Sequence, residues 1–176
     1  EVVPDAEDSA GESGGRDVNG DGYDDVLVGA PMHHVAVEHE GAVYLYYGNS
    51  SGLSTMPAWS KTGNSADAQL GCAVAGAGDV NYDNYDDVLV GSCNYKNSEG
   101  VNIGAVYLYY GSLTGLRPSA EPFADWEFPG PQAGSRLGAS LAGLGDLNHD
   151  GYADFAVGAP CYDGSGYIDI GLVHVF

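Results

Sequence analysis

Acidic and amide side chains recur at alternate positions in three short stretches of this sequence. The stretches read DVNGDGYDD at 17–25, DVNYDNYDD at 79–87 and DLNHDGYAD at 146–154. Each places an oxygen-bearing side chain at positions 1, 3, 5 and 9. Ca²⁺ binds about six to eight such oxygens, and alternate spacing points successive odd side chains toward the inside of one loop. The pattern therefore predicts three loops that bind a hard divalent cation.

Two further positions of each stretch fit a loop folded around an ion. Position 6 is Gly or Asn, the residue types that best tolerate the positive φ of a sharp turn. Position 7 is Tyr23, Tyr85 or Tyr152, and we expect the backbone carbonyl there, rather than the phenol, to bind the ion. Asn, Asp and Gly are also common in ordinary turns. A turn alone, however, does not require the Asp at position 9.

The stretches are not EF-hands. An EF-hand requires a Glu at position 12 and flanking helices. Here position 12 is Val28, Val90 or Val157, and the flanking sequence is typical of strands.

The charge of the chain excludes several classes of partner. There are 25 acidic residues against 5 Lys and Arg, for a formal charge of −20. Nucleic acids and anionic membranes both require a basic surface. No apolar run approaches the ~18 residues of a spanning helix, so we expect no membrane insertion. The nine Asp residues at positions 1, 5 and 9 would repel one another, which predicts that folding depends on metal. The chain begins at Glu1 without a signal peptide, and we interpret it as a mature or excised segment.

The acidic loops belong to a longer internal repeat. The loops are offset by 62 and 67 residues, and the surrounding sequence repeats with them. Each unit predicts four short strands: an Ala/Gly-rich strand, a strand after the acidic loop, the GAVYLYYG strand and a strand with a Trp, Trp59 or Trp126. Apolar residues line both faces of the third strand, so both faces must be covered. Stacked four-stranded blades meet that demand. We therefore predict one segment, 1–176, with repeats at about 9–63, 70–130 and 137–176, the last one truncated.

The repeat resembles a known family. LGCAVAGAGD (70–79) and LGASLAGLGD (137–146) precede acidic loops, VGAP follows two of them, and GAVYLYYG occurs twice. This pattern is similar to the FG-GAP repeat of integrin α-subunit β-propellers and related secreted proteins. The resemblance implies an all-β fold of three FG-GAP β-propeller blades, each of about four short antiparallel strands. It also implies an incomplete propeller, because the family ring usually has about seven blades.

The resemblance further implies a structural Ca²⁺ in each acidic loop, three sites in all. By position, the ligands are those of loop one (Asp17, Asn19, Asp21, Tyr23, Asp25), loop two (Asp79, Asn81, Asp83, Tyr85, Asp87) and loop three (Asp146, Asn148, Asp150, Tyr152, Asp154).

Two departures from the family concern how the ring is completed. Glu12 stands where the other first strands have Val74 and Leu141, and the third repeat stops at Phe176, before a Trp-bearing strand. Terminal blades would expose an apolar face and unpaired edges. We therefore expect further blades of a longer chain to complete the propeller, or else other chains in an oligomer or filament.

The cysteines, the histidines and one asparagine carry further predictions. Antiparallel pairing about the second loop places Cys72 opposite Cys93, which predicts a disulfide and an oxidising compartment. Two buried free thiols are the alternative. Cys161 has no evident partner and is either free or paired with another chain. His33, His34 and His39 share one loop, but no acid or Cys at fixed spacing supports a metal site, so we predict a solvated loop. His174 is predicted to pack in a third strand, and Asn49 begins a glycosylation sequon.

Taken together, these patterns predict a secreted or cell-surface, calcium-stabilised module that serves adhesion, scaffolding or extracellular assembly without catalysis. One alternative is a carbohydrate-binding, lectin-like propeller that uses exposed aromatic residues such as Tyr95 or Tyr162 to bind glycans. Another is an accessory domain of a hydrolase or lyase. No catalytic residues are assigned.

Overall fold

The computed structural model describes residues 11–14, 17–34, 36–118 and 124–176. Over these residues the chain is all β, with thirteen strands. In this part of the chain no helix is long and apolar enough to cross a membrane. Residues 9 and 10, where the first repeat is predicted to begin, lie outside the described residues.

The first blade is a four-stranded antiparallel sheet with the order β1-β2-β3-β6. Its strands are β1 (Gly11–Gly14), β2 (Val26–Ala30), β3 (Ala42–Tyr46) and β6 (Trp59–Thr62). A small hairpin of β4 (Gly48–Asn49) and β5 (Gly52–Leu53) leads from β3 toward β6.

The second blade repeats this arrangement, and the third stops one strand short. Blade two pairs β7 (Leu70–Gly78), β8 (Asp87–Ser92), β9 (Ala105–Tyr109) and β10 (Trp126–Pro129) in that spatial order. Blade three contains β11 (Ser140–Gly145), β12 (Asp154–Ala159) and β13 (Leu172–Val175). The predicted fold class, all-β blades of short antiparallel strands in an incomplete propeller, is confirmed.

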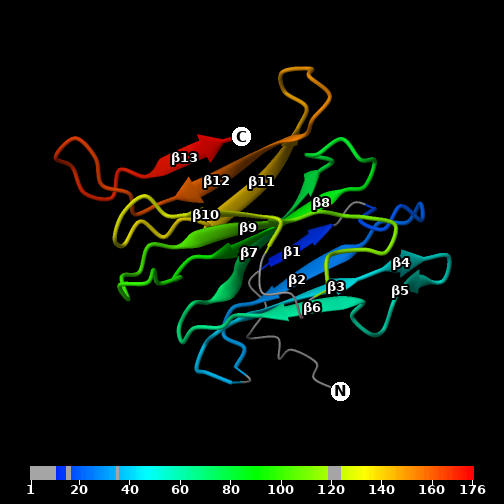
Figure 1. The fold of residues 1–176 in the computed structure, drawn as a ribbon, viewed down its shortest axis with the longest axis horizontal. Coiled ribbons are helices and arrows are strands. Elements are labelled where there is room, and N and C mark those ends of the chain that lie inside the picture. Colours follow the sequence, from blue (N-terminus) through cyan, green and yellow to red (C-terminus); the bar gives the residue numbers. More distant parts are fainter. Residues whose placement is uncertain (1–10, 15–16, 35, 119–123) are drawn as a thin grey trace.

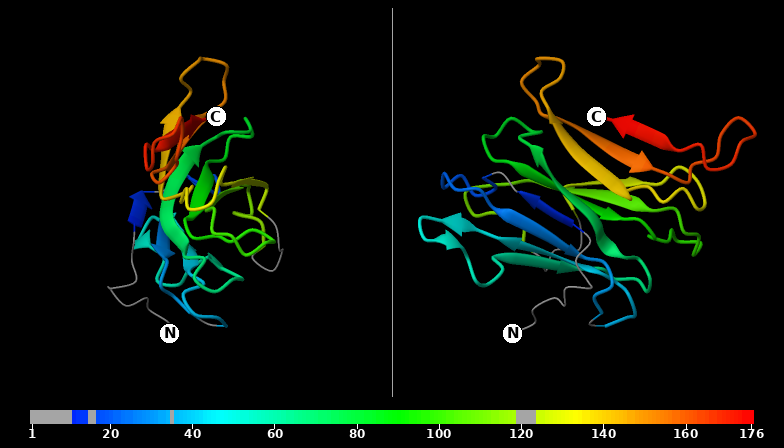
Figure 2. Two further views of the ribbon diagram at one scale, coloured as in Figure 1. Left: turned by 90° about the vertical axis from the view of Figure 1, so that its left-hand side faces the viewer. Right: turned by 180° about the vertical axis from the view of Figure 1, so that it is seen from behind.

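The three sheets stack in chain order. In Figure 1 blade one (blue and cyan) lies below blade two (green and yellow), and blade three (orange and red) lies above it; the views of Figure 2 agree. A hydrophobic core lies at each junction between blades. The first contains Val18, Leu27, Val43, Leu45, Trp59, Leu70, Val88, Val90, Tyr109 and Leu116. The second contains Ala75, Ala77, Leu89, Val106, Leu108, Leu137, Phe155, Val157 and Ala159.

Glycines allow the inner strands of neighbouring blades to approach closely. A Cβ on Gly29 would collide with the backbone carbonyl of Gly71, and a Cβ on Gly91 with that of Gly138. Both Gly71 and Gly138 have positive φ, near 84° and 86°, a conformation that side chains other than glycine rarely adopt. The Ala/Gly-rich first strands are therefore explained by contact between backbones.

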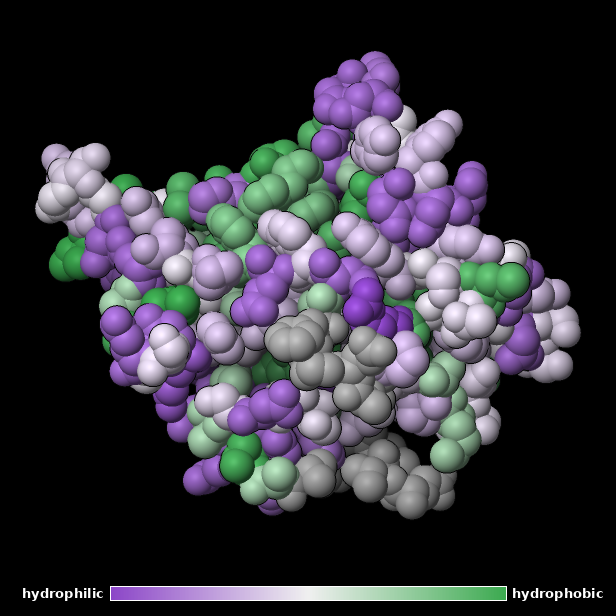
Figure 3. Space-filling model, viewed as in Figure 1, coloured by the Kyte–Doolittle hydropathy of each residue, from purple (hydrophilic) through white to green (hydrophobic). Residues whose placement is uncertain are grey.

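Within the described residues, the middle blade is covered on both faces and the third blade is not. Strand β8 of blade two is buried at all six residues, whereas four of the six residues of β11 are exposed. On the edge strand β13, Val173 and Val175 are 65% and 59% exposed. Figure 3 shows hydrophobic side chains gathered at the upper edge of the molecule, where blade three lies. Blade three thus keeps an uncovered apolar surface.

Candidate metal-binding loops

The three acidic loops lie at one edge of the stacked blades, each between the first and second strands of its own sheet (Figure 1). Backbone hydrogen bonds join consecutive loops. Asp86 N donates to Asp17 O at 3.2 Å, and Ala153 N donates to Asp79 O at 2.9 Å. The fold therefore brings all three predicted sites together on one side of the molecule.

The Asp at position 1 organises each loop by accepting from its backbone. Asp17 accepts from Asp21 N at Oδ1 (2.9 Å) and from Gly22 N at Oδ2 (2.7 Å). Asp79 and Asp146 accept from the equivalent backbone groups at 2.8–3.1 Å. This side chain closes the loop as a turn does and keeps a carboxylate at its centre.

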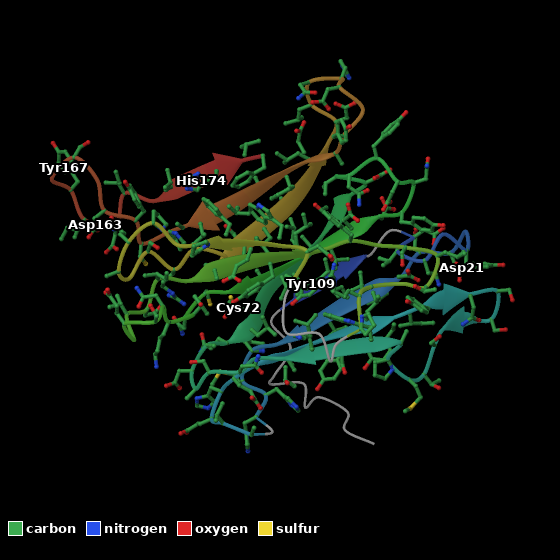
Figure 4. The ribbon with its side chains drawn as sticks, viewed as in Figure 1. Asp21, Cys72, Tyr109, Asp163, Tyr167 and His174 are labelled. Atoms are coloured by element: carbon green, nitrogen blue, oxygen red, sulfur yellow. The ribbon has the colours of Figure 1, made fainter. Side chains whose placement is uncertain are left out.

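Positions 3 and 5 are linked to each other. In loop one, Asn19 Nδ2 donates to Asp21 Oδ2 at 3.1 Å, and Asp21 N donates to Asn19 Oδ1 at 3.0 Å. Tyr23 N donates to Asp21 Oδ1 at 3.0 Å. The same three bonds recur in loops two and three. In Figure 4 Asp21 lies at the outer end of its loop.

The backbone at position 6 has the predicted conformation. Gly22, Asn84 and Gly151 have φ of 88°, 70° and 97°. Position 4 is also in the left-handed region, although it is Tyr82 in loop two and His149 in loop three, both at φ 63°. A bulky residue such as Tyr rarely adopts positive φ, so residue type in loop two did not reveal this second turn position.

The Asp at position 9 has a role that the sequence did not suggest. The side chains of Asp25 and Asp87 are fully buried. Asp25 accepts from Val18 N and from Gly48 N, both at 3.0 Å, and Asp87 accepts from Val80 N (2.8 Å) and Gly111 N (2.9 Å). Each carboxylate therefore joins the start of its loop to the glycine that follows the third strand.

Burial and neighbouring charge both disfavour ionisation of these two carboxylates. Desolvation raises the pKa of Asp87 to about 7, against two backbone hydrogen bonds that lower it, and the charges of Asp83 and Asp79 raise it further. The pKa of Asp25 is raised for the same reasons, with Asp21 and Asp17 as the charged neighbours. In loops one and two, the acids are thus close enough to repel one another.

The loops bring the predicted ligands near one another without gathering them onto one point. Among the described residues, no three acidic, His or Cys side chains converge in a geometry that could hold a metal ion, because the carboxylates here accept from backbone N–H groups. The donor set still fits a hard cation: each loop offers only oxygen donors, three of them carboxylates, with excess negative charge. The rings of Tyr23 and Tyr152 are exposed, which leaves the backbone carbonyl as the donor expected at position 7.

Cys72 and Cys93 are neighbours, as the sequence predicts, and the structure holds both as free thiols. Cys93 N donates to Cys72 Sγ at 2.9 Å. The pKa of Cys93 is lowered to about 7 by its hydrogen bond with the Cys72 thiol and by the nearby Arg136 guanidinium. The predicted contact is confirmed, whereas the disulfide bond itself stays a prediction. Cys161 is also a free thiol.

The histidines of the first blade have separate partners. His33 Nε2 lies 3.3 Å from the Tyr44 hydroxyl, and His39 Nδ1 lies 3.4 Å from Asp67 Oδ1. His174, on β13 (Figure 4), packs edge-on against Phe128 with ring centroids 5.1 Å apart. The packing role of His174 is confirmed. Asn49, the sequon residue, is exposed in the β4–β5 hairpin.

The chain matches a known repeat family and a set of curated relatives. The FG-GAP repeat model matches residues 11–46 and 137–170. The chain is 35% identical to integrin alpha-PS3 of Drosophila melanogaster over 148 residues, and 37% identical to integrin alpha-IIb of Mus musculus over 150 residues. It is also 35% identical to integrin alpha-6 of Gallus gallus over 147 residues. These matches include 81–82% of this chain but only 12–14% of each relative, so the chain spans about an eighth of the length of these proteins.

Proposed function

Because the chain belongs to the FG-GAP repeat family and is similar to integrin α subunits, we propose that it is a calcium-stabilised segment of a secreted or cell-surface β-propeller. In this proposal the segment serves adhesion, scaffolding or extracellular assembly and carries out no catalysis. The three repeats, at about 9–63, 70–130 and 137–176, are three blades of one domain. Further blades of a longer chain, or other chains, complete the propeller.

The observation that carries the proposal is the threefold repetition of one acidic loop along a single edge. Each loop has the same internal hydrogen bonds and a ninth-position Asp at the start of its second strand. The ions would be held by the side chains at positions 1, 3, 5 and 9 and by the backbone carbonyls of Tyr23, Tyr85 and Tyr152. A bound Ca²⁺ supplies positive charge to the acid cluster, and this role requires no chemistry.

The physical benefit of a cation is largest where the acids are most buried. A buried carboxylate loses solvation, and like charges nearby add to that cost. Asp87 is buried and also lies near the charges of Asp83 and Asp79. A divalent ion in each loop would offset them and would fix the hairpin between the first two strands of the blade.

Calorimetric titration with CaCl₂ tests the sites one at a time. We expect three calcium ions per chain, and two for each of the variants Asp21→Asn, Asp83→Asn and Asp150→Asn, because each removes a charged ligand at position 5. Asp24→Asn is the matched control: Asp24 is an exposed neighbour in loop one outside the ligand pattern, so it should keep three. Full binding by the position-5 variants would contradict the assignment.

Secretion is part of the proposal, and two covalent features would accompany it. An oxidising compartment permits a disulfide between Cys72 and Cys93, whose thiols are already in contact. The exposed Asn49 would be available for glycosylation. Neither feature is required for the blades to stack.

A carbohydrate-binding propeller is a second candidate, and one observation favours it. Tyr95 and Tyr107 line a cavity of about 350 Å³ beside the first and second blades, together with Lys61 and Glu127. Aromatic faces combined with a few polar groups are typical of small-ligand sites. On a glycan array, binding that Tyr95→Ala abolishes would support this function. Tyr162→Ala is the comparison, because Tyr162 packs against the second core; no glycan binding at all would reject the candidate.

A further inference from the structure

The junction of blades one and two is closed by a segment that follows β9. This segment, Gly111–Pro118, is called the strap below. Its Leu116 is buried in the first core beside Trp59. The Trp59 indole Nε1 donates to Arg117 O at 2.7 Å. At the other end of the strap, Ser112 N donates to Val18 O at 3.1 Å.

The junction of blades two and three has a similar lining, and within the described part of the chain no strap lies over it. A groove of about 430 Å³ lies there, on the side of the third acidic loop. The residues equivalent to those around Leu116 line it in the same relative places: Val80, Leu108, Tyr110, Trp126, Phe155 and Phe176. The groove thus contains the counterparts of Val18, Leu45, Tyr47, Trp59, Val88 and Tyr109, which surround the first core, and among the described residues it has no counterpart of Leu116.

Hydrogen-bonding groups at the groove match the strap as well. In blade two the strap begins at Gly111, whose N donates to Asp87 Oδ1 at 2.9 Å while Val80 N donates to Oδ2 at 2.8 Å. In the third blade Asp154 accepts from Leu147 N at 2.7 Å. Among the described residues no glycine beyond β13 supplies the second bond. Val80 is half-buried, whereas its counterpart Val18 is fully buried under the strap.

We propose that this groove is a docking site for a polypeptide strap with the chemistry of Gly111–Pro118, entering along the edge strand β13. A leucine side chain packs beside Trp126 and Phe176, whose rings are themselves in edge contact with centroids 5.1 Å apart. The carbonyl that follows the leucine accepts from the Trp126 indole N–H, and a backbone N–H beside β13 donates to Asp154. Asp150 and Asp154 at one end of the groove disfavour acidic straps and favour a neutral or basic one, as in the Leu-Arg of the chain's own strap.

The occupant is a peptide segment rather than a small molecule, because the template inside the chain uses backbone groups at both ends and one apolar side chain between them. Such addition of a segment beside an edge strand is a common mode of peptide recognition. The leucine provides most of the buried apolar area, and the backbone bonds set the register.

Extending the chain tests the proposal directly. The sequence YGSLTGLRP, copied from Tyr110–Pro118, is appended after Phe176, and the protein is studied in saturating calcium. We expect the melting temperature to rise by several degrees. In ¹H–¹⁵N spectra the indole signal of Trp126 should shift, while that of Trp59, already bonded to Arg117 O, should stay in place.

Two altered extensions provide matched controls. Leu116→Asp in the appended copy should abolish both effects, because it places a charge in the groove. Leu113→Asp should preserve them, since Leu113 of the existing strap is 76% exposed. Added to the unextended chain at millimolar concentration, the unaltered and Leu113→Asp peptides should shift the Trp126 indole signal, whereas the Leu116→Asp peptide should leave it in place.

Three outcomes would overturn the proposal. One is equal stabilisation by the Leu116→Asp and unaltered extensions. Another is an unmoved Trp126 indole with every extension and peptide. The third is a Trp126 signal that moves with the concentration of the unextended chain, together with self-association in sedimentation, which would identify a second copy as the occupant.

Discussion

At the scale of single residues, the ninth-position aspartates connect the loops to the sheets. The Asp25 and Asp87 carboxylates each join two backbone N–H groups that are 30 and 31 residues apart in sequence, respectively. A buried carboxylate that makes such bonds is expensive to remove, because both donors would lose their acceptor. Loss of these side chains is therefore expected to damage the blade beyond the loss of an ion.

The two cysteines of the second blade give a residue-scale prediction. Mild oxidation with glutathione disulfide should join Cys72 to Cys93, because the thiols are in contact and the lowered pKa of Cys93 supplies thiolate near neutral pH. Peptide mapping by mass spectrometry should show the linked peptides, with Cys161 still open to alkylation. A Cys161-linked product, or two reduced thiols after prolonged oxidation, would contradict the pairing.

The sequence predicted the turn at position 6 because that turn depends on nearby residues, whereas the metal ligands assigned to each loop stay a prediction. It did not predict the positive φ of Tyr82 and His149, because a bulky residue such as Tyr rarely adopts that conformation and the closure of the loop imposes it. It also missed the bonds from Asp87 to Gly111, because the partner belongs to a strand that lies beside the loop only after the sheet has formed.

At the scale of elements, hydrophobic pattern and repeat spacing predicted the short strands of each blade. The observed orders β1-β2-β3-β6 and β7-β8-β9-β10 follow directly from consecutive antiparallel pairing. The strap was not predicted. Its anchoring residue Leu116 stands alone between turn residues, and only the packed junction shows that it fills a space beside Trp59.

Close packing of the inner strands gives a prediction for Gly91. Gly91→Ala should destabilise the protein by about 3 kcal/mol, because the added methyl meets the rigid Gly138 carbonyl of the next blade. Urea denaturation in saturating calcium measures the change.

Gly134→Ala is the control for the Gly91 experiment. Gly134 has positive φ but open space around its Cα. Its replacement should cost only about 1 kcal/mol, from backbone strain. If both variants lost the same free energy of unfolding, contact between the blades would not be what requires glycine at position 91.

At the scale of the whole molecule, each blade depends on the next. Core residues lie between the sheets, so a single blade could not bury its own apolar faces, as in other repeat proteins. The exposed Val173 and Val175 on β13 show how the third blade ends without a neighbour. The resemblance to the family predicted an incomplete propeller, but it could not show which surface further blades would cover.

In this account, the acidic loops make the stability of the stacked blades depend on the calcium concentration. They lie side by side along one edge of the stack, and each begins the second strand of its blade. If each loop holds a calcium ion, stability should follow calcium concentration. A site that binds only the folded state contributes about 2.7 kcal/mol at a hundredfold excess of ligand over its Kd.

Thermal unfolding with and without calcium tests this account most directly. In excess CaCl₂ we expect one cooperative transition. After exhaustive chelation the melting temperature should fall by many degrees, or the transition should disappear. Added calcium should restore it. Asp83→Asn should show a smaller response than the unmodified chain. A melting temperature that exhaustive chelation leaves unchanged would contradict the claim that calcium in these loops stabilises the blades.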